Sequence, residues 1–96
     1  MRVYLIVDVR KIRVKKKYAE YVRKVPETIR RFGGRYLARG SETQVVSGKW
    51  KPGRLVIVEF PSMKRFREWW DSAQYRKIKP LRERSARTNA VVAAGM

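Results

Sequence analysis

Two stretches of the chain are apolar almost throughout, and both predict strands in the middle of a sheet. Arg54–Pro61 reads RLVIVEFP, and turn-forming residues flank it at Lys51-Pro52-Gly53 and at Pro61-Ser62. Arg2–Arg10 alternates a wholly apolar set of residues with a half-apolar set. A strand with one face in water alternates apolar and polar residues, whereas a strand covered on both sides is apolar throughout. We therefore expect both strands to be buried on both faces.

The apolar residues between these two strands predict an amphipathic helix. They recur at steps of four, three, four and three residues, which places them on one helical stripe. Pro26 lies inside the stripe and predicts a kink or a break at Lys24–Val25, and Gly33-Gly34 ends the helix. The preceding Lys11–Lys17 is expected to be a basic connector. The stripe consists of Tyr18, Val22, Val25, Ile29 and Phe32.

The other segments predict two more strands and a second helical region. Arg35–Gly40 is expected to be a short strand that continues through Thr43–Ser47 beyond a bulge or turn. Ser62 is a suitable helix N-cap, and Asp71-Ser72 offers a second capping point. Asn89–Ala94 is expected to be the last strand. The helical stripes are Met63, Phe66, Trp69 and Trp70, followed by Tyr75, Ile78 and Leu81.

The resulting order is strand, helix, strand, strand, helix, strand, which is the split βαβ pattern of the ferredoxin-like fold. We expect one α+β domain over residues 1–96, with an antiparallel sheet and both helices on one face. The first and third strands should be central. The helices account for the burial of one face only, so the pattern predicts a homodimer in which a second subunit packs face to face on the other.

Five segments carry a resemblance to a known family, and together they cover most of the chain. They are YLIVDV at Tyr4–Val9, VPETIRRFGGRYLARG at Val25–Gly40, WKPGRLVIVEFPS at Trp50–Ser62, WWDSAQY at Trp69–Tyr75 and ERSARTNAVV at Glu83–Val92. They resemble a bacterial family known as domain of unknown function 1330, in the dimeric α+β barrel superfamily. The resemblance implies a face-to-face dimer and no particular reaction; relatives in the superfamily include cofactor-free monooxygenases and isomerases.

The chain departs from this family at its surface. Members usually carry acidic residues in the connector before the first helix, around Gln44, Ser47 and Lys49, at Lys64 and near Ala94, where this chain is basic or neutral. One hypothesis is an engineered chain, recharged or given a new assembly interface; a natural basic homologue is the alternative. The added interface would consist of apolar residues set among lysines and arginines, namely Ile12, Val14, Phe66 and Ile78.

The charge balance predicts a surface that binds polyanions. The chain has 25 lysines and arginines against 8 acidic residues, a formal net charge of +17, whereas small soluble domains carry a net charge of about 2–8. Basic residues also interleave with aromatic ones, a pattern that can hold phosphates and stack bases. No motif for reading base sequence is present. The expected surface consists of Lys11, Arg13, Lys15, Lys16, Lys17, Lys64, Arg65, Arg67, Arg76, Lys77 and Lys79.

The composition also limits the chemistry. Cysteine and histidine are absent, which removes disulfides, thiolate sites, the commonest zinc ligand and the commonest general base. We expect no metal and no cofactor. No signal peptide and no apolar run of roughly 18 residues is present, so a cytoplasmic location is expected.

Only two acidic residues lie inside the predicted core strands. Asp8 and Glu59 are therefore weak candidates for a general base, because burial can raise the pKa of a carboxyl group. The alternative is that each pairs with an arginine, such as Arg10, Arg39 or Arg54. The two residues should lie at opposite ends of the sheet, which is a poor arrangement for a catalytic pair.

Five aromatic residues could line a pocket between the helices and the sheet, although helical spacing also fits a filled core. They are Tyr36, Trp50, Trp69, Trp70 and Tyr75. Two functions are thus open. The first is a non-catalytic, basic, homodimeric scaffold that binds polyanions without sequence preference; the second is a small-molecule-binding protein or a cofactor-free enzyme. A filled core would favour the scaffold, and an enclosed cavity with a polar group among Tyr36, Trp50 and Trp70 would favour the second function.

Overall fold

The computed structural model describes residues 1–96, apart from the side chain of Ser41. Across these residues the element order is strand, helix, strand, strand, helix, helix, strand. The second helical region is divided at the capping point that the sequence predicts. The elements are β1 (Val3–Ile12), α1 (Lys15–Arg31), β2 (Arg35–Ser41), β3 (Arg54–Phe60), α2 (Met63–Trp70), α3 (Ala73–Ser85) and β4 (Ala86–Ala94).

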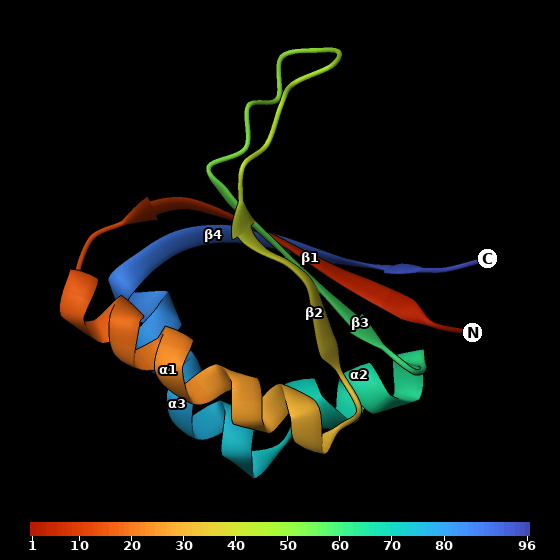
Figure 1. Cartoon of the computed structure of the whole chain (residues 1–96). Helices are drawn as coiled ribbons and strands as arrows, with labels where there is room; N and C mark the ends of the chain where they lie inside the picture. The colour runs from red at the N-terminus through yellow and green to blue at the C-terminus, as the bar shows by residue number, and fades with distance from the viewer.

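The strands form one antiparallel sheet in the order β2-β3-β1-β4. The central positions of β1 and β3 follow from their apolar sequences, because a central strand pairs on both edges and is covered most completely. The helices lie together on one face of the sheet, and the ribbon leaves the other face bare (Figure 1). The predicted ferredoxin-like α+β fold is therefore confirmed.

Two serines fix the starts of α2 and α3. The hydroxyl of Ser62 accepts a hydrogen bond from the backbone N–H of Arg65, and the hydroxyl of Ser72 accepts one from the N–H of Tyr75, both at 3.1 Å. Each serine pairs an N–H group that the first helical turn cannot pair by itself. Both N-caps lie where the sequence predicts them.

The first helix has no break at Pro26, one of the two outcomes that the sequence predicts, because α1 runs through this proline. A proline inside a helix lacks the N–H that would bond to the carbonyl four residues earlier. That residue is Val22, and the guanidinium of Arg39 on β2 donates to its carbonyl oxygen at 2.7 Å. A side chain from the sheet therefore supplies the donor that the proline lacks, and Pro80 lies inside α3 in the same unbroken way.

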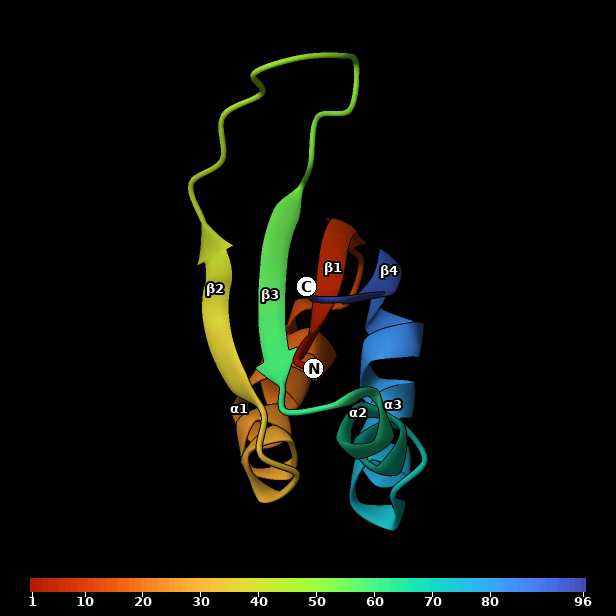
Figure 2. The same ribbon diagram turned by 90° about the vertical axis from the view of Figure 1, so that its right-hand side faces the viewer.

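The strand predicted at Thr43–Ser47 is wrong. Residues 42–53 instead form a loop that extends beyond the end of the sheet (Figure 2). Val46 in this loop is 91% exposed, so its apolar character reflects no burial in this chain. The last strand is longer than predicted, since Ala86 already pairs with Ile12 at the end of β1. The predicted connector is thus shared between β1 and α1.

The two faces of the sheet are both apolar. The face under the helices holds the core, in which Val3, Val58 and Phe60 are buried. On the other face the strand register aligns a row of apolar residues across the sheet, with Val91 at its β4 end 62% exposed. We call this set the open-face row; it consists of Ala38, Ile57, Ile6 and Val91.

Candidate functional site

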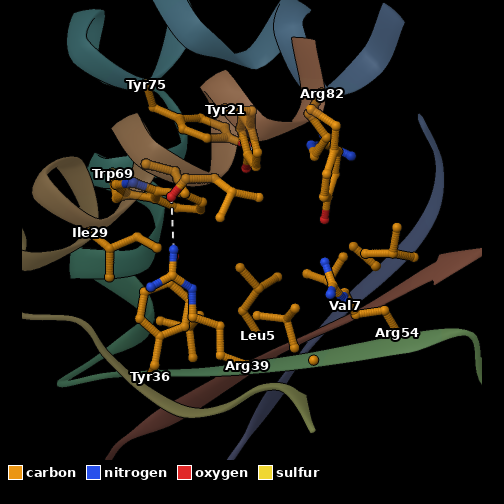
Figure 3. Close-up of a pocket in the computed structure, with 18 of the residues that line it drawn as sticks. Leu5, Val7, Tyr21, Ile29, Tyr36, Arg39, Arg54, Trp69, Tyr75 and Arg82 are labelled. Carbon is orange, nitrogen blue, oxygen red and sulfur yellow. Dashed lines mark hydrogen bonds between the residues drawn. The ribbon is translucent and has the colours of Figure 1, made fainter. Parts of the chain in front are cut away.

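A cavity of about 230 Å³ lies between the sheet and the helices (Figure 3). Its floor is formed by every second side chain of β1 and β3. Successive side chains of a strand point to opposite faces, so only one set from each strand faces the cavity. Its other walls come from the three helices and from β2. The floor residues are Leu5, Val7, Val9, Val56 and Val58. The aromatic residues that line the cavity are Tyr18, Tyr21, Tyr36, Trp69, Trp70 and Tyr75.

One end of the cavity is a packed aromatic wall. The ring centroids of Trp69 and Tyr75 are 4.1 Å apart, and Trp69 is 2% exposed. The indole N–H of Trp69 donates to the hydroxyl of Thr28 at 3.0 Å, and that hydroxyl donates to the carbonyl of Val25 at 2.8 Å. The polar atom of Trp69 is thus paired within the helical layer, so its position is set by a hydrogen bond as well as by packing.

The tyrosine hydroxyls supply the neutral polar groups of the cavity. The hydroxyls of Tyr21 and Tyr75 are 3.0 Å apart and share a hydrogen bond. Burial, together with the neighbouring Tyr75, raises the pKa of Tyr21. Burial likewise raises the pKa of Tyr36 to about 12, although the charge of Arg39 acts in the opposite direction. These two hydroxyls therefore stay protonated near neutral pH, where they can donate as well as accept hydrogen bonds.

Three arginines from three different elements also line the cavity. We call Arg39 on β2, Arg54 at the start of β3 and Arg82 on α3 the arginine cluster. The guanidinium of Arg39 lies 4.7 Å from the ring centroid of Tyr36. The stem of Arg54 packs on Gly40, where a Cβ atom would come within 2.9 Å of its Cγ, so this glycine makes room for the arginine.

The arginine cluster has no acidic partner in the described part of the chain. Six other arginines form ion pairs with carboxylates, but none of these pairs includes a cluster member. Arg82 donates to the hydroxyl of Thr88, and Arg39 to the carbonyl of Val22. Because a guanidinium has five N–H donors, most of the cluster's hydrogen-bonding capacity is free for another acceptor.

Asp8 and Glu59 lie outside the cavity and form ion pairs. Asp8 accepts hydrogen bonds from Arg10 at 2.9 Å, from the indole of Trp50 at 2.9 Å and from the backbone of Gly53 at 2.8 Å. Burial alone would raise the pKa of Asp8, but these three donors outweigh it and the pKa is lowered. Both residues therefore stay ionised as arginine-paired groups near neutral pH, as the alternative interpretation of the sequence predicts.

Glu59 follows the same pattern at the other end of the sheet. Its carboxylate lies 2.8 Å from Arg35 and 3.0 Å from Arg2. Burial acts to raise its pKa, but the bonds and charges of Arg35 and Arg2 dominate and lower it. In the strand register Glu59 pairs with Tyr4 and Asp8 pairs with Leu55, so the two carboxylates are separated along the sheet.

Four of the five predicted pocket residues do line the cavity, and Trp50 does not. Trp50 lies in the long loop, is 60% exposed and donates to Asp8. The sequence interpretation missed Tyr18, Tyr21 and the arginine cluster. A signal for Arg54 was present, because it has the same strand parity as Val56 and Val58, whose side chains face the helices. Nothing local in the sequence marks Arg82.

The added interface proposed from sequence loses half of its residues. Phe66 and Ile78 are 5% and 8% exposed and belong to the core, so the expectation that they are surface residues is wrong. Ile12 is half-buried against a small cluster of its own chain. Val14 is 39% exposed. The helical steps that connect Phe66 with Trp69 and Ile78 with Tyr75 mark these residues as core-facing.

The predicted polyanion surface falls into two groups. One group lies where β1 meets α1, and the other lies on α2 and α3. Most of these residues are exposed, but two are held by neighbours: Arg65 pairs with Glu68, and the ammonium of Lys79 lies 4.2 Å from the ring centroid of Trp70. The exposed residues are Lys11, Arg13, Lys15, Lys16, Lys17, Lys64, Arg67, Arg76 and Lys77.

Two further features bear on the classes of site. Among the described residues, acidic side chains do not gather in groups of three or more that could hold a metal ion. In the same residues, no helix combines the length and the apolar character needed to cross a membrane.

Solved structures with the same fold include proteins of unknown function and an oxygenase. The RPA0582 protein of unknown function from Rhodopseudomonas palustris is 19% identical, with a TM-score of 0.78 over 99% of this chain and 82% of that chain. A dimeric ferredoxin-like protein of unknown function from Jannaschia is 8% identical, with a TM-score of 0.71 over 99% and 100% of the two chains. SnoaB, a cofactor-independent oxygenase from Streptomyces nogalater, is 7% identical, with a TM-score of 0.61 over 99% and 91%. At these identities the likeness shows the fold alone.

The family is shown by sequence. No curated protein matches the chain. A family model described as "Domain of unknown function (DUF1330)" matches residues 2–96, which include the core strands, the capping serines and the cavity residues. The resemblance inferred from the five sequence segments is therefore confirmed, and the chain belongs to the DUF1330 family.

Proposed function

We propose that this chain binds a small, flat organic molecule in the cavity between the sheet and the helices. The observation that carries the proposal is the cavity itself, with an apolar floor, an aromatic end wall and the hydroxyl of Tyr36 in its lining. The core is not filled and the polar group is present, which supports small-molecule binding over the scaffold, although the cavity is partly open to solvent and not enclosed. Its volume of about 230 Å³ is below the range of roughly 300–1,000 Å³ typical of ligand pockets, which favours a ligand of one or two rings.

The proposal is one of binding and not of a particular reaction. SnoaB, with the same fold, is a cofactor-independent oxygenase, so a cofactor-free oxidation or isomerisation is the catalytic form of the hypothesis. The described lining contains no carboxylate, and the chain has no histidine or cysteine. A substrate of such a reaction would therefore need to be acidic enough to ionise without a conventional base.

Filling the cavity tests this proposal. Val56→Phe places a larger side chain on the cavity floor, and we expect it to lower the affinity for the neutral probe 2-naphthamide at least tenfold by isothermal titration calorimetry. The matched control is Val45→Phe, which adds the same volume in the exposed loop. Overpacking costs about 1–3 kcal/mol, so thermal unfolding should show that the variant is folded. Unchanged affinity in Val56→Phe would refute the proposal.

We also propose that a second copy of the chain covers the bare face of the sheet. The support is the open-face row, which presents apolar residues of all four strands on one flat face, and the Jannaschia protein of the same fold is dimeric. The two carboxylates of this face are neutralised within the chain, because Asp8 pairs with Arg10 and Glu59 pairs with Arg35 and Arg2. An apolar face framed by neutralised charges fits a copy of itself.

Sedimentation velocity tests the homodimer at micromolar concentration. Ile57→Glu introduces a carboxylate in the middle of the open-face row and should yield folded monomers. Val46→Glu makes the same charge change at the exposed loop and should remain dimeric. A wild-type monomer at this concentration would contradict the proposal.

A second function, polyanion binding, is supported by the net charge of +17 and by the exposure of most of the predicted basic surface. We propose that this binding is electrostatic and independent of sequence. Neutralising about 5–8 phosphates gives a log–log salt slope of roughly −4 to −7 on duplex DNA. Fluorescence anisotropy with two unrelated duplexes and with heparin should show equal, salt-sensitive binding. A tenfold preference for one duplex that survives about 200 mM salt would indicate a specific readout site instead.

A further inference from the structure

We infer that the ligand of the cavity is an organic acid, whose anionic group is bound by the arginine cluster while its flat apolar body occupies the cavity. This inference rests on the proposed small-molecule function and names the class of its ligand. A carboxylate, an enolate or a phenolate on a system of one or two rings has the required chemistry.

Three arginines from distant parts of the sequence line the same cavity. Figure 3 shows Arg39 and Arg54 on the sheet side of the cavity and Arg82 on the helix side. Tyr18 lines the same cavity; burial raises the pKa of its hydroxyl, while the positive charges of Arg54, Arg82 and Arg39 act to lower it. An anion inside the cavity would be attracted by the same three charges.

The cluster differs from the other basic residues of this chain in what surrounds it. The exposed lysines of the polyanion surface face solvent alone, whereas the arginines of the cluster border an apolar cavity; Arg39 and Arg54 are themselves exposed, so only Arg82 is drawn partly out of water. Arg82 is half-buried and makes its hydrogen bond to the neutral Thr88. A cation beside apolar walls loses part of its hydration, and an anionic ligand would replace the lost interactions with charge-assisted hydrogen bonds.

The geometry of the wall also selects the body of the ligand. The floor offers aliphatic side chains, and the aromatic end wall of Trp69 and Tyr75 offers ring faces for a planar group. A sugar phosphate would bury its hydroxyl groups against aliphatic side chains without partners, which is costly. A nucleic-acid backbone is too large for a cavity of about 230 Å³. An aromatic or conjugated acid fits both the charge and the walls.

A pair of isosteric probes tests the inference. Isothermal titration calorimetry at 150 mM NaCl would compare 2-naphthoate, which is anionic, with 2-naphthamide, which is neutral and nearly the same in shape. One charge-assisted hydrogen bond corresponds to roughly a tenfold difference in affinity, so we expect naphthoate to bind at least tenfold more tightly. Arg54→Gln and Arg82→Gln should each reduce this preference severalfold. Two variants are used in case one of them fails to fold. Circular dichroism would show whether each is folded.

The control variant separates the cluster from the overall charge. Arg87→Gln removes one exposed arginine of β4, outside the cavity, and should leave the preference unchanged. If it lowers the preference as much as the cluster variants do, the net charge and not the cluster is responsible, and the inference fails. Equal affinity of the two probes would overturn the inference and leave the proposed cavity function intact. Absence of binding by both probes would overturn the proposed function and the inference with it.

Discussion

The two faces of the sheet have nearly the same composition but different surroundings. On the helix side, Leu5, Val58 and their neighbours contact α1 and the aromatic side chains of α2 and α3, and a cavity remains between the layers. On the other side no helix covers the open-face row, although Ile6 and Ile57 are as apolar as their neighbours along the strands. Strand parity alone therefore shows that both faces need a cover, but not what the cover is.

The difference lies in the residues that frame each face. On the helix side, the apolar residues of the sheet are bordered by Arg39 and Arg54. These arginines have no acidic partner in the described chain. On the open face, the apolar residues are bordered by Asp8 and Glu59, whose carboxylates arginines already neutralise. A face with free positive charge fits a small anion, whereas a neutralised apolar face fits another protein surface. The predictions below test this contrast, beginning with the largest effect.

A charge on the helix side should unfold the protein. Val58 is 2% exposed, and Val58→Glu would bury a carboxylate with no partner, at a cost of several kcal/mol. Because the total stability of a domain this size is about 5–15 kcal/mol, we expect loss of most or all cooperative thermal unfolding, as measured by circular dichroism. Ile57→Glu, one residue away and on the open face, should keep its transition. If Val58→Glu unfolds at nearly the wild-type temperature, the assignment of the two faces is wrong.

Removal of one hydroxyl in the helical layer should have an intermediate effect. Thr28→Val keeps the shape of the side chain but leaves the buried indole N–H of Trp69 without its acceptor. An unsatisfied buried donor costs about 1–3 kcal/mol, which corresponds to a decrease in Tm of several degrees. Thr43→Val in the long loop is the matched control and should leave Tm unchanged. An unchanged Tm in Thr28→Val would mean that Trp69 is held by packing alone.

Acid should weaken the open face first. The pKa values of Asp8 and Glu59 are lowered in the folded protein, mainly because hydrogen bonds and arginine charges outweigh burial. Their stabilisation is therefore complete above the unfolded pKa of about 4 and is lost as the pH falls through the lower folded values. Urea unfolding between pH 5 and pH 2 should show this loss, and the double variant Asp8→Asn, Glu59→Gln should reduce the pH dependence. Glu42→Gln, in the exposed loop, should leave the wild-type profile unchanged.

The smallest effect is expected in the long loop, which belongs to neither face. Val46 is 91% exposed, and Val46→Ser should change the free energy of unfolding by no more than about 0.5 kcal/mol. The dimer dissociation constant, measured by sedimentation, should also remain unchanged. A tenfold weaker dimer would show instead that the loop contacts the second copy.

Much of the fold could be predicted from sequence because its determinants are local or periodic. The uninterrupted apolar runs identify β1 and β3 as central, and Ser62 and Ser72 mark the starts of α2 and α3. The prediction failed where a distant group intervenes. Pro26 does not break α1, since Arg39 on another element bonds to the carbonyl that the proline leaves free. No window of sequence around Pro26 contains this information.

The site was only half predictable for the same reason. Tyr36, Trp69, Trp70 and Tyr75 are recognisable because large aromatic residues between helices and a sheet either fill a core or line a cavity. The arginine cluster is assembled from three elements; strand parity marks Arg54, but among the 25 basic residues of the chain no local pattern distinguishes Arg39 or Arg82. Trp50 was misplaced because its indole N–H bonds to Asp8, a residue distant in sequence, and no local pattern indicates this contact.

The hydroxyls near the arginine cluster have a consequence for any affinity measured as a function of pH. Burial raises the pKa of Tyr18 and of Tyr36, the latter to about 12, and an arginine keeps its proton throughout the usual range. The cluster and its tyrosines therefore present a constant charge between about pH 6 and pH 9. Any change of affinity over this range would then come from the ionisation of the ligand: a carboxylic acid, ionised throughout, would bind with constant affinity, whereas a phenol would bind more tightly as the pH rises towards about 9.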